Sequence, residues 1–297
     1  MNKRQQVCTW LSIITIGSTN PVFAQTILPS TGNYYQQPQS IPIYVPPPES
    51  NNQNQNHNNS GVCQSFLAPG IEEVINRYGG GWGILVQKLD DGEVLYQYNA
   101  DRHFIPASNI KILTTAAALQ KLQPQTTISS NKSLKEWVTV TNLRSNNYYA
   151  DTLLKYIGGA WEAKKTLMDI GVNPQSFYLA DGSGLSRNNK ATPRALVETL
   201  RVMYYAPNRD IFLTSLPTAG MSGTLSNRMK QTPVQGIVHA KTGTLTGVRA
   251  LSGYLEHRQH GTLVFSILAN NSKQSGTALV RGIDEIVLLI NMTSACE

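Results

Sequence analysis

The sequence predicts an α+β fold, in which an antiparallel sheet formed by the two ends of the folded region is flanked by helices and a small helical subdomain. Three observations predict it. Residues 81–99 contain two β-rich runs around Asp91-Gly92, a strong signal for a two-residue hairpin. The middle of the chain has helical periodicity. Residues 249–270 have the pattern of a second antiparallel hairpin, and a terminal helix follows.

The elements follow in chain order. After the first hairpin, apolar spacing predicts a run of helices, at 108–122, 134–143, 149–156 and 161–170. Gly171 is expected to cap the last of these. The stretch "SFYLADGSGLSRNN" predicts a short strand that leads into a polar loop. Thr192-Pro193 is a helix start, with a capping residue before proline, and that helix should reach about residue 205. The terminal helix is expected at 277–290.

Three parts of the chain differ in composition. Residues 1–24 have the pattern of a secretory signal, with Lys3 and Arg4, an apolar run and "VFA" before Gln25; a membrane anchor is the alternative. Residues 25–62 form a linker rich in Pro, Gln and Asn, which we expect to be a disordered tether or, alternatively, a partner-binding peptide. Residues 63–297 then have about the right size for one domain, or for two closely packed subdomains, with a helical part that spans roughly 108–171. We therefore expect an exported protein of the periplasm or another extracytoplasmic space, without a stable membrane span after signal cleavage.

Charge and cysteines narrow the class of protein. Loss of Lys3 and Arg4 with the signal lowers the net charge from +7 to +5, without basic clusters, so nucleic acid is not an expected partner. Cys63 and Cys296 remain at the two ends of the domain, where we expect a disulfide; two free thiols are the alternative. No metal cluster or phosphate-binding loop is evident, and His257 and His260 are placed in an exposed polar turn rather than a metal site.

Ser108 and Lys111 lie three residues apart where "FIPASNIK" enters the apolar run "ILTTAAAL". At the start of a helix, such residues project from the same face, and a lysine made neutral by burial can remove the serine proton. On this pair alone, Ser108 reads better as a helix cap. Ser129 and Lys132 repeat the spacing without a following apolar helix.

Two further stretches support a reactive serine. "HAKTGTL" places Lys241, Thr242 and Gly243 on a predicted strand, suited to a peptide that ends in a carboxylate. The N–H of Thr244, with that of Ser108, is expected to form an oxyanion hole.

Ser-x-Asn, the third element, occurs at Ser129, Ser145 and Ser186. We prefer Ser145 to Asn147, because it joins two predicted helices at a corner; Ser145 would relay a proton and Asn147 would bind the substrate backbone. A helix-capping role is the alternative for Asn147. The prediction requires these groups and both lysines to meet in one crevice.

The ordered motifs "SNIK", "SNN" and "KTG" resemble those of penicillin-recognising serine acyltransferases. The blocks "DGSGLSRNN", "LPTAGMSGTLSNR" and "HAKTGTLTGVRALSGYL" are similar to those of the D-alanyl-D-alanine carboxypeptidase/endopeptidase family, the class C low-molecular-mass penicillin-binding proteins. The resemblance covers most of residues 70–295. It implies a penicillin-binding-protein/serine β-lactamase-like fold without a metal or organic cofactor.

The resemblance also implies an activity. Peptidoglycan stem peptides would be the substrate, cut through an acyl-enzyme on Ser108, with β-lactam antibiotics as covalent inhibitors. Lys111 would be the general base, while Ser145 and Lys241 would handle the leaving-group proton and the substrate carboxylate. Family members commonly carry large domains between the first two motifs, but Ser108 and Ser145 are only 37 residues apart. The short spacing argues against endopeptidase action on cross-linked polymer, and it raises the alternative of an inactive copy.

Two rival readings stay open. The first is a non-catalytic peptidoglycan-binding module, a degraded penicillin-binding protein that uses the same groove. The second is a serine β-lactamase, whose class A form needs a glutamate that activates the deacylating water. None of the acids between the second and third motifs lies in a Glu-x-x-Leu-Asn block; they are Asp151, Glu162, Asp169, Asp181, Glu198 and Asp210. We therefore expect slow deacylation of penicillins.

Overall fold

The structure is a computed structural model that describes residues 64–294 of the 297-residue chain, with side chains described from Leu67 onward. The predictions for the signal at 1–24, for the linker at 25–62 and for Cys63 and Cys296 lie outside the described residues. Within the described range, no helix combines the length and the apolar character needed to cross a bilayer.

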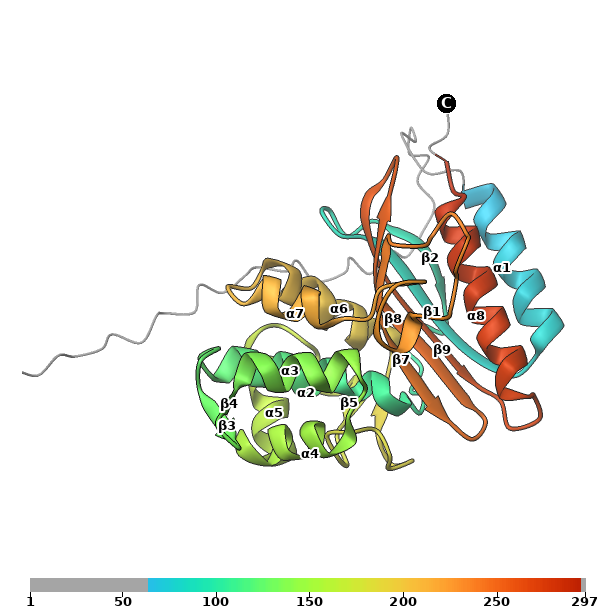
Figure 1. Ribbon diagram of the computed structural model, residues 1–297. Coiled ribbons are helices and arrows are strands. Elements are labelled where there is room, and N and C mark those ends of the chain that lie inside the picture. Colours follow the sequence, from blue (N-terminus) through green and yellow to red (C-terminus); the bar gives the residue numbers. More distant parts are fainter. Residues whose placement is uncertain (1–63, 295–297) are drawn as a thin grey trace, which may run out of the picture. The chain divides into compact units, whose positions relative to one another are not determined.

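A five-stranded antiparallel sheet forms the centre of the described region, in the order β2-β1-β9-β8-β7. Its strands are β1 (Gly81–Lys88), β2 (Val94–Tyr98), β7 (Val238–Leu245), β8 (Val248–His257) and β9 (Gly261–Asn270). β1 pairs with β9 from Gly81↔Asn270 to Lys88↔Leu263, so the first and last hairpins meet side by side. The predicted sheet from the two ends of the folded region is therefore confirmed (Figure 1).

Both faces of the sheet are buried, because side chains alternate along each strand. In β9, Phe265 and Ile267 belong to the core on one face, while Val264 and Leu268 belong to the core on the other. Helices α1 (Gln64–Tyr78) and α8 (Gly276–Asn291) cover the first face, side by side in Figure 1.

α1 and α8 run antiparallel. Gly70, early in α1, lies against the Leu289 side chain near the end of α8. At the other end of the pair, the Tyr78 hydroxyl donates to Glu285 at 2.8 Å. The start of α1 and the end of α8 are therefore neighbours.

The second face carries the helical part. Its helices are the 3-10 turn η1 (Ala107–Asn109), α2 (Ile110–Lys121), α3 (Leu134–Leu143), α4 (Asn147–Tyr156), α5 (Gly159–Asp169), α6 (Pro193–Tyr205) and α7 (Arg209–Ser215). Short hairpins join β3 (Thr127–Ser129) to β4 (Lys132–Ser133) and β5 (Phe177–Tyr178) to β6 (Lys190–Ala191), and a second 3-10 turn, η2, spans Gly223–Leu225. Helices α2 to α7 share one hydrophobic core with the sheet, whereas Leu225 of η2 belongs to the core on the first face.

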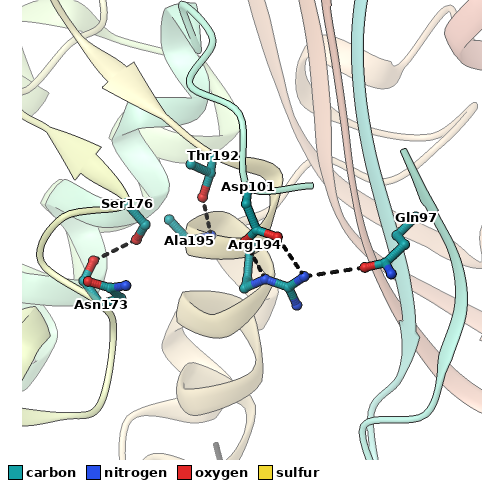
Figure 2. A network of polar contacts seen from close by, with 7 residues as sticks. All are labelled: Gln97, Asp101, Asn173, Ser176, Thr192, Arg194 and Ala195. Atoms are coloured by element: carbon teal, nitrogen blue, oxygen red, sulfur yellow. Dashed lines mark hydrogen bonds and ion pairs between the residues drawn. The ribbon is translucent and has the colours of Figure 1, made fainter. Parts of the chain in front are cut away.

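Figure 2 shows how α6 is fixed beside the first hairpin. Thr192 caps the helix, since its side chain accepts from the Ala195 amide at 3.0 Å, as the Thr192-Pro193 signal predicts. Arg194, the second residue of the helix, donates to the carboxylate of Asp101 through two nitrogen atoms and reaches Gln97 at 3.3 Å. The ion pair joins the helix to the segment that leads toward Ser108.

The structure departs from the sequence expectations at three places. α1 was not expected, because Pro69 interrupts its pattern next to the linker, and α7 has only seven residues, too short for a clear period. The prediction of an exposed turn for His257 and His260 is wrong: their side chains are only 7% and 8% exposed, and their rings stack at 4.6 Å. Burial against the backbone near the end of α8 explains this.

Candidate active site

The turn that carries Ser108 is held in an unusual backbone conformation. Ile105 is fixed to β9 by two hydrogen bonds with the Asn270 amide, at 2.8 and 3.1 Å. Ala107 then has a φ of 48°, a conformation that a residue with a Cβ rarely adopts. A Cβ on Gly184 would lie 2.0 Å from the Ala107 carbonyl oxygen, so only glycine fits beside this turn. Strain of this kind is characteristic of functional turns.

Ser108 does not act as a helix cap. It lies within η1, and α2 begins at Ile110 without any side-chain capping bond. Its hydroxyl oxygen instead accepts a hydrogen bond from the Lys111 amine at 2.9 Å. The same amine donates to Asn147 Oδ1 at 2.8 Å and to the backbone carbonyl of Ser183. Three acceptors therefore orient the lysine onto the serine.

Burial makes Lys111 a base. Its side chain is fully buried on α2, and desolvation lowers its pKa from 10.5 to about 8. Asp151 and Asp181 act in the opposite direction and keep the pKa from falling further. At neutral pH a useful fraction of Lys111 is neutral and able to accept the Ser108 proton.

Ser145 and Lys241 form a second hydroxyl–amine pair. Ser145 lies in the corner between α3 and α4, with a φ of 54°, and accepts from the Lys241 amine at 2.8 Å. Lys241 is fully buried on β7; desolvation first, and the charge of Lys111 second, lower its pKa well below the usual value. Asn146 caps α4 by accepting from the Tyr149 amide, which leaves Asn147 free to bind Lys111.

β7 presents part of its outer edge to this region. Residues 238 and 240 bond outward, since Val238 accepts from the Ala219 amide and Ala240 donates to Pro217, both at 2.9 Å. Backbone groups alternate along an antiparallel strand, so the N–H groups of Thr242 and Thr244 point to the same outer side. There they adjoin η1: a Cβ on Gly243 would lie 2.6 Å from the Pro106 carbonyl.

A cleft of about 360 Å³ opens over these groups. Ser108, Ser145, Asn147, Thr242 and Thr244 all line it, while Lys111 and Lys241 lie buried beneath the two serines. The remaining lining residues are Gly184, Leu185, Thr224, Arg228, Leu245 and Val280. The structure therefore brings the predicted residues to one crevice.

Sequence reasoning missed the loop at 181–189 as a structural part of the site. The Asp181 carboxylate accepts from the Asn189 side-chain amide and from the backbone amides of Ser183, Gly184 and Ser186. Burial raises the pKa of Asp181, but these hydrogen bonds outweigh it and hold the pKa low. Asp151 accepts from the Gly182 amide at 2.9 Å. Together they aim the Ser183 carbonyl at Lys111. The cluster of turn formers in "DGSG" is the signal that indicates such a loop.

Arg228 and Thr224 are also new members of the site. The Thr224 and Thr242 hydroxyls are 2.7 Å apart, and Arg228 lines the cleft while it pairs with Asp284 of α8. Arg228 therefore places a partly buried guanidinium, paired with the Asp284 carboxylate, in the wall of the cleft. The block "SGTLSNR" contains both residues, but spacing alone does not reveal their neighbour on β7.

The competing motifs lie outside the cleft. Ser129 and Lys132 fall on the β3–β4 hairpin, where the Lys132 amine donates to the Tyr149 hydroxyl at 3.1 Å. Ser186 belongs to the loop held by Asp181 and does not line the cleft. Among the described residues, no carboxylate lines the cleft, and no three His, Cys, Asp or Glu side chains are grouped to hold a metal ion.

Comparisons with known proteins agree with this geometry. The model of the D-Ala-D-Ala carboxypeptidase 3 (S13) family matches residues 72–132 and 128–291. Penicillin-sensitive carboxypeptidase A of Dictyostelium discoideum is 41% identical over 178 residues, which cover 53% of this chain and 34% of that protein. The aligned regions span between 26% and 37% of the length of the curated relatives that the chain matches.

Solved structures support the fold. Penicillin binding protein 4 (dacB) of Haemophilus influenzae has a TM-score of 0.65 at 14% identity, covering 74% of this chain and 99% of that one. A β-lactamase of Chitinophaga pinensis has a TM-score of 0.64 at 18% identity, covering 76% and 98%. The fold is thus that of penicillin-binding proteins and serine β-lactamases, as predicted. With the family match over most of its described length, the chain belongs to the D-Ala-D-Ala carboxypeptidase 3 (S13) family.

Proposed function

We propose that this chain is a serine D-Ala-D-Ala carboxypeptidase that removes the terminal D-alanine from peptidoglycan stem peptides. One observation carries the proposal: the buried Lys111 amine, with its pKa lowered to about 8, lies 2.9 Å from the Ser108 hydroxyl oxygen. In a family of D-Ala-D-Ala carboxypeptidases, that contact supplies the activated nucleophile that the reaction requires.

Acylation uses the groups on both sides of Ser108. Neutral Lys111 takes the hydroxyl proton as Ser108 Oγ attacks the carbonyl carbon of the penultimate D-alanine. The N–H groups of Ser108 and Thr244 stabilise the oxyanion, donors whose loss typically costs about 10²–10³ in rate. Ser145, hydrogen-bonded to Lys241, gives its hydroxyl proton to the amide nitrogen as the C–N bond breaks, and regains a proton from the Lys111 ammonium, so that Lys111 is neutral again. D-Alanine leaves, and the peptide stays bound to Ser108 as an ester.

Deacylation reverses the proton path. Lys111 takes a proton from a water molecule that attacks the ester carbonyl, and Ser108 recovers its proton as the C–O bond breaks. A β-lactam opens its ring in the first half of the reaction, but its amine stays tethered to the acyl group. Because no described carboxylate lines the cleft, the water that would hydrolyse this adduct lacks a carboxylate base. A long-lived penicillin adduct follows, rather than β-lactamase turnover.

The substrate carboxylate belongs beside β7. Lys241 is fully buried behind Ser145. Its amine is therefore better placed to assist proton transfer by Ser145 than to bind the substrate carboxylate directly. Thr242, Thr244 and Arg228 line the cleft and offer two hydroxyl donors and a guanidinium. We assign carboxylate binding to these three residues, and substrate-backbone binding to Asn147.

Labelling with a fluorescent penicillin tests the proposal. The parent protein should carry covalent label, Ser108→Ala should carry none, and Ser129→Ala, which alters the serine of the same spacing on the β3–β4 hairpin, should label like the parent. A folded parent that takes no label would favour a non-catalytic binding module. Rapid turnover of a chromogenic cephalosporin would favour a β-lactamase.

Mass spectrometry of digested muropeptides identifies the reaction. Loss of one alanine per stem peptide is the expected product of a carboxypeptidase. Scission of cross-linked dimers would show D,D-endopeptidase action, for which a chain with only 36 residues between Ser108 and Ser145 has little room to add accessory contacts.

We also propose export and a disulfide between Cys63 and Cys296. The antiparallel packing of α1 and α8 supports the disulfide, because Cys63 directly precedes α1 and Cys296 follows α8 by a few residues. Alkylation followed by intact-mass measurement, with and without reductant, tests the pairing. Two thiols that react in the unreduced protein would exclude it.

A further inference from the structure

A second hollow, as large as the active-site cleft, lies elsewhere on the molecule. Its volume is about 380 Å³, against about 360 Å³ for the cleft. The end of α6, α7, the segment 216–222 and the far ends of β7, β8 and β9 enclose it. The lining residues are Tyr204, Arg209, Leu213, Thr214, Leu216, Thr218, Ser222, His239, Tyr254, Glu256 and Thr262. We call it the α7 pocket.

The α7 pocket is separate from the active-site cleft, and the two share no lining residue. The segment 216–222 lies between them, because it covers the edge of β7: Thr218 bridges His239, the Ala219 amide donates to the Val238 carbonyl, and the Ala240 amide donates to the Pro217 carbonyl. His239 lines the pocket two residues before Lys241 on the same strand.

Among its described lining residues, the α7 pocket contains one guanidinium, that of Arg209, and one carboxylate, that of Glu256, which lies 3.7 Å from His239 Nε2 and forms no ion pair with Arg209. The Arg209 guanidinium lies 4.0 Å from the centre of the Tyr204 ring and forms no ion pair with any described residue. Stacking leaves the N–H donors at the edge of the guanidinium free, and this geometry suits a carboxylate. The hydroxyls of Thr214, Thr218 and Ser222 add polar groups nearby.

One wall of the pocket is apolar and aromatic, while His239, Glu256 and Thr262 complete the lining. The rings of Tyr204 and Tyr254 lie 5.7 Å apart, and the Tyr254 hydroxyl is already bonded to the Leu200 carbonyl, so this ring presents an apolar face. Leu213 and Leu216 continue that surface. A concave, largely apolar wall with a few polar groups is the usual form of a small-ligand site.

We infer that the α7 pocket binds short peptides that end in a free carboxylate, with the carboxylate on Arg209 and the aliphatic body against Tyr204, Tyr254 and Leu213. The volume of the pocket supports a peptide, because it is close to the volume of the active-site cleft, which would bind the end of a stem peptide. The choice of a peptide, rather than another carboxylate of similar size, rests on the proposed function. The preference for a carboxylate follows from the Arg209 guanidinium.

Site-resolved NMR titration tests the inference. The probe is diacetyl-L-lysyl-D-alanine, added to the Ser108→Ala protein so that no turnover occurs. Backbone amide signals of Thr218 and Thr262 should shift with the probe. Arg209→Gln should weaken the binding reported by these two signals about tenfold or more, as expected for loss of a charge-assisted contact. The probe with a C-terminal amide should show the same loss of binding on the Ser108→Ala protein that keeps Arg209.

Arg281→Gln, which removes an equally exposed arginine from α8, is the matched control and should leave the titration unchanged. The inference is overturned if the Thr218 and Thr262 signals do not move, if Arg209→Gln titrates like the control, or if the amide probe binds as tightly as the acid. Arg209 is exposed, so its substitution leaves the fold intact. Penicillin labelling reports on Ser108 independently, so failure of the proposed function and failure of the α7 pocket are distinguished.

Discussion

The pH dependence of acylation follows directly from the environment of Lys111. Only the neutral amine accepts the Ser108 proton, and burial brings its pKa to about 8. About 1% of Lys111 is then neutral at pH 6 and about half at pH 8, so the second-order rate of penicillin acylation should rise about 50-fold between them. With an ordinary lysine of pKa 10.5 as the base, the acylation rate would still be rising steeply at pH 9.

Asp151→Asn tests the cause of this pKa. Asp151 lies one helical turn after Asn147 on α4, and its negative charge raises the pKa of the Lys111 amine. In general, a carboxylate about 7 Å from an amine raises the pKa of the amine by about 0.4 to 1.7 units for effective dielectric constants of about 80 to 20. Asparagine keeps an oxygen for the Gly182 amide but removes the charge. The half-rise of the profile should therefore move to lower pH by about one unit.

Stopped-flow measurement with a fluorescent penicillin between pH 5.5 and 9.5 gives the profile. Asp169→Asn, an exposed acid at the end of α5, is the matched control and should superpose on the parent. The reasoning is refuted if the parent profile is flat across this range, or if Asp151→Asn moves the half-rise upward or leaves it in place.

Three further predictions follow. Gly184→Ala should cost at least about 3 kcal/mol of unfolding free energy and abolish labelling, because a Cβ there meets a backbone oxygen at 2.0 Å in addition to strain at a φ of 88°. Gly159→Ala, at a φ of 85° with open space around it, should cost only about 1 kcal/mol in the same denaturant titration; equal losses would contradict the clash. Arg228→Gln should lower kcat/KM about tenfold or more on peptides with a free terminal carboxylate, yet leave activity on the same peptides with a terminal amide unchanged. An equal loss on both peptides would instead indicate a structural role. His257 and His260 are buried with pKa values lowered below 6.5, so the unfolded chain takes up their protons first and stability should fall as pH drops below about 6.5. Replacing both by glutamine should flatten that part of the curve in thermal unfolding, and an unchanged slope would disprove the assignment.

The sequence predicts the elements whose signals are local. Thr192-Pro193 and Gly171 each fix the backbone within a few residues, and the structure has a capped helix and a φ of 94° at these places. Asp91-Gly92 marks a hairpin that the structure confirms, but the predicted two-residue turn is wrong, because residues 89–93 connect β1 to β2. The helices at 134–143 and around 161–170 agree within about two residues at each end, because their apolar faces are regular. α1 escapes this reasoning, since its stability comes from packing against α8, which is more than 200 residues away.

The site shows the same division. The serine–lysine pairs are visible as short motifs, and the structure brings Ser108 and Ser145 to one cleft. The carbonyl of Ser183 and the guanidinium of Arg228 belong to residues without a motif of their own, and only the folded chain shows that they lie beside Lys111 and Thr242. Backbone acceptors are a general blind spot, because every residue has one.

The outer edge of β7 has one more consequence. An unprotected sheet edge invites other chains to add strands and promotes aggregation. Here the segment at 217–219 shields the first part of that edge, and the exposed remainder near Thr242 and Thr244 is only a few residues long, walled by the turn of Ser108. A stretch this short accommodates the tip of an extended oligomer but is too brief to recruit a whole strand from a second molecule. The short exposed edge of β7 therefore suits a bound peptide and disfavours strand pairing between two molecules.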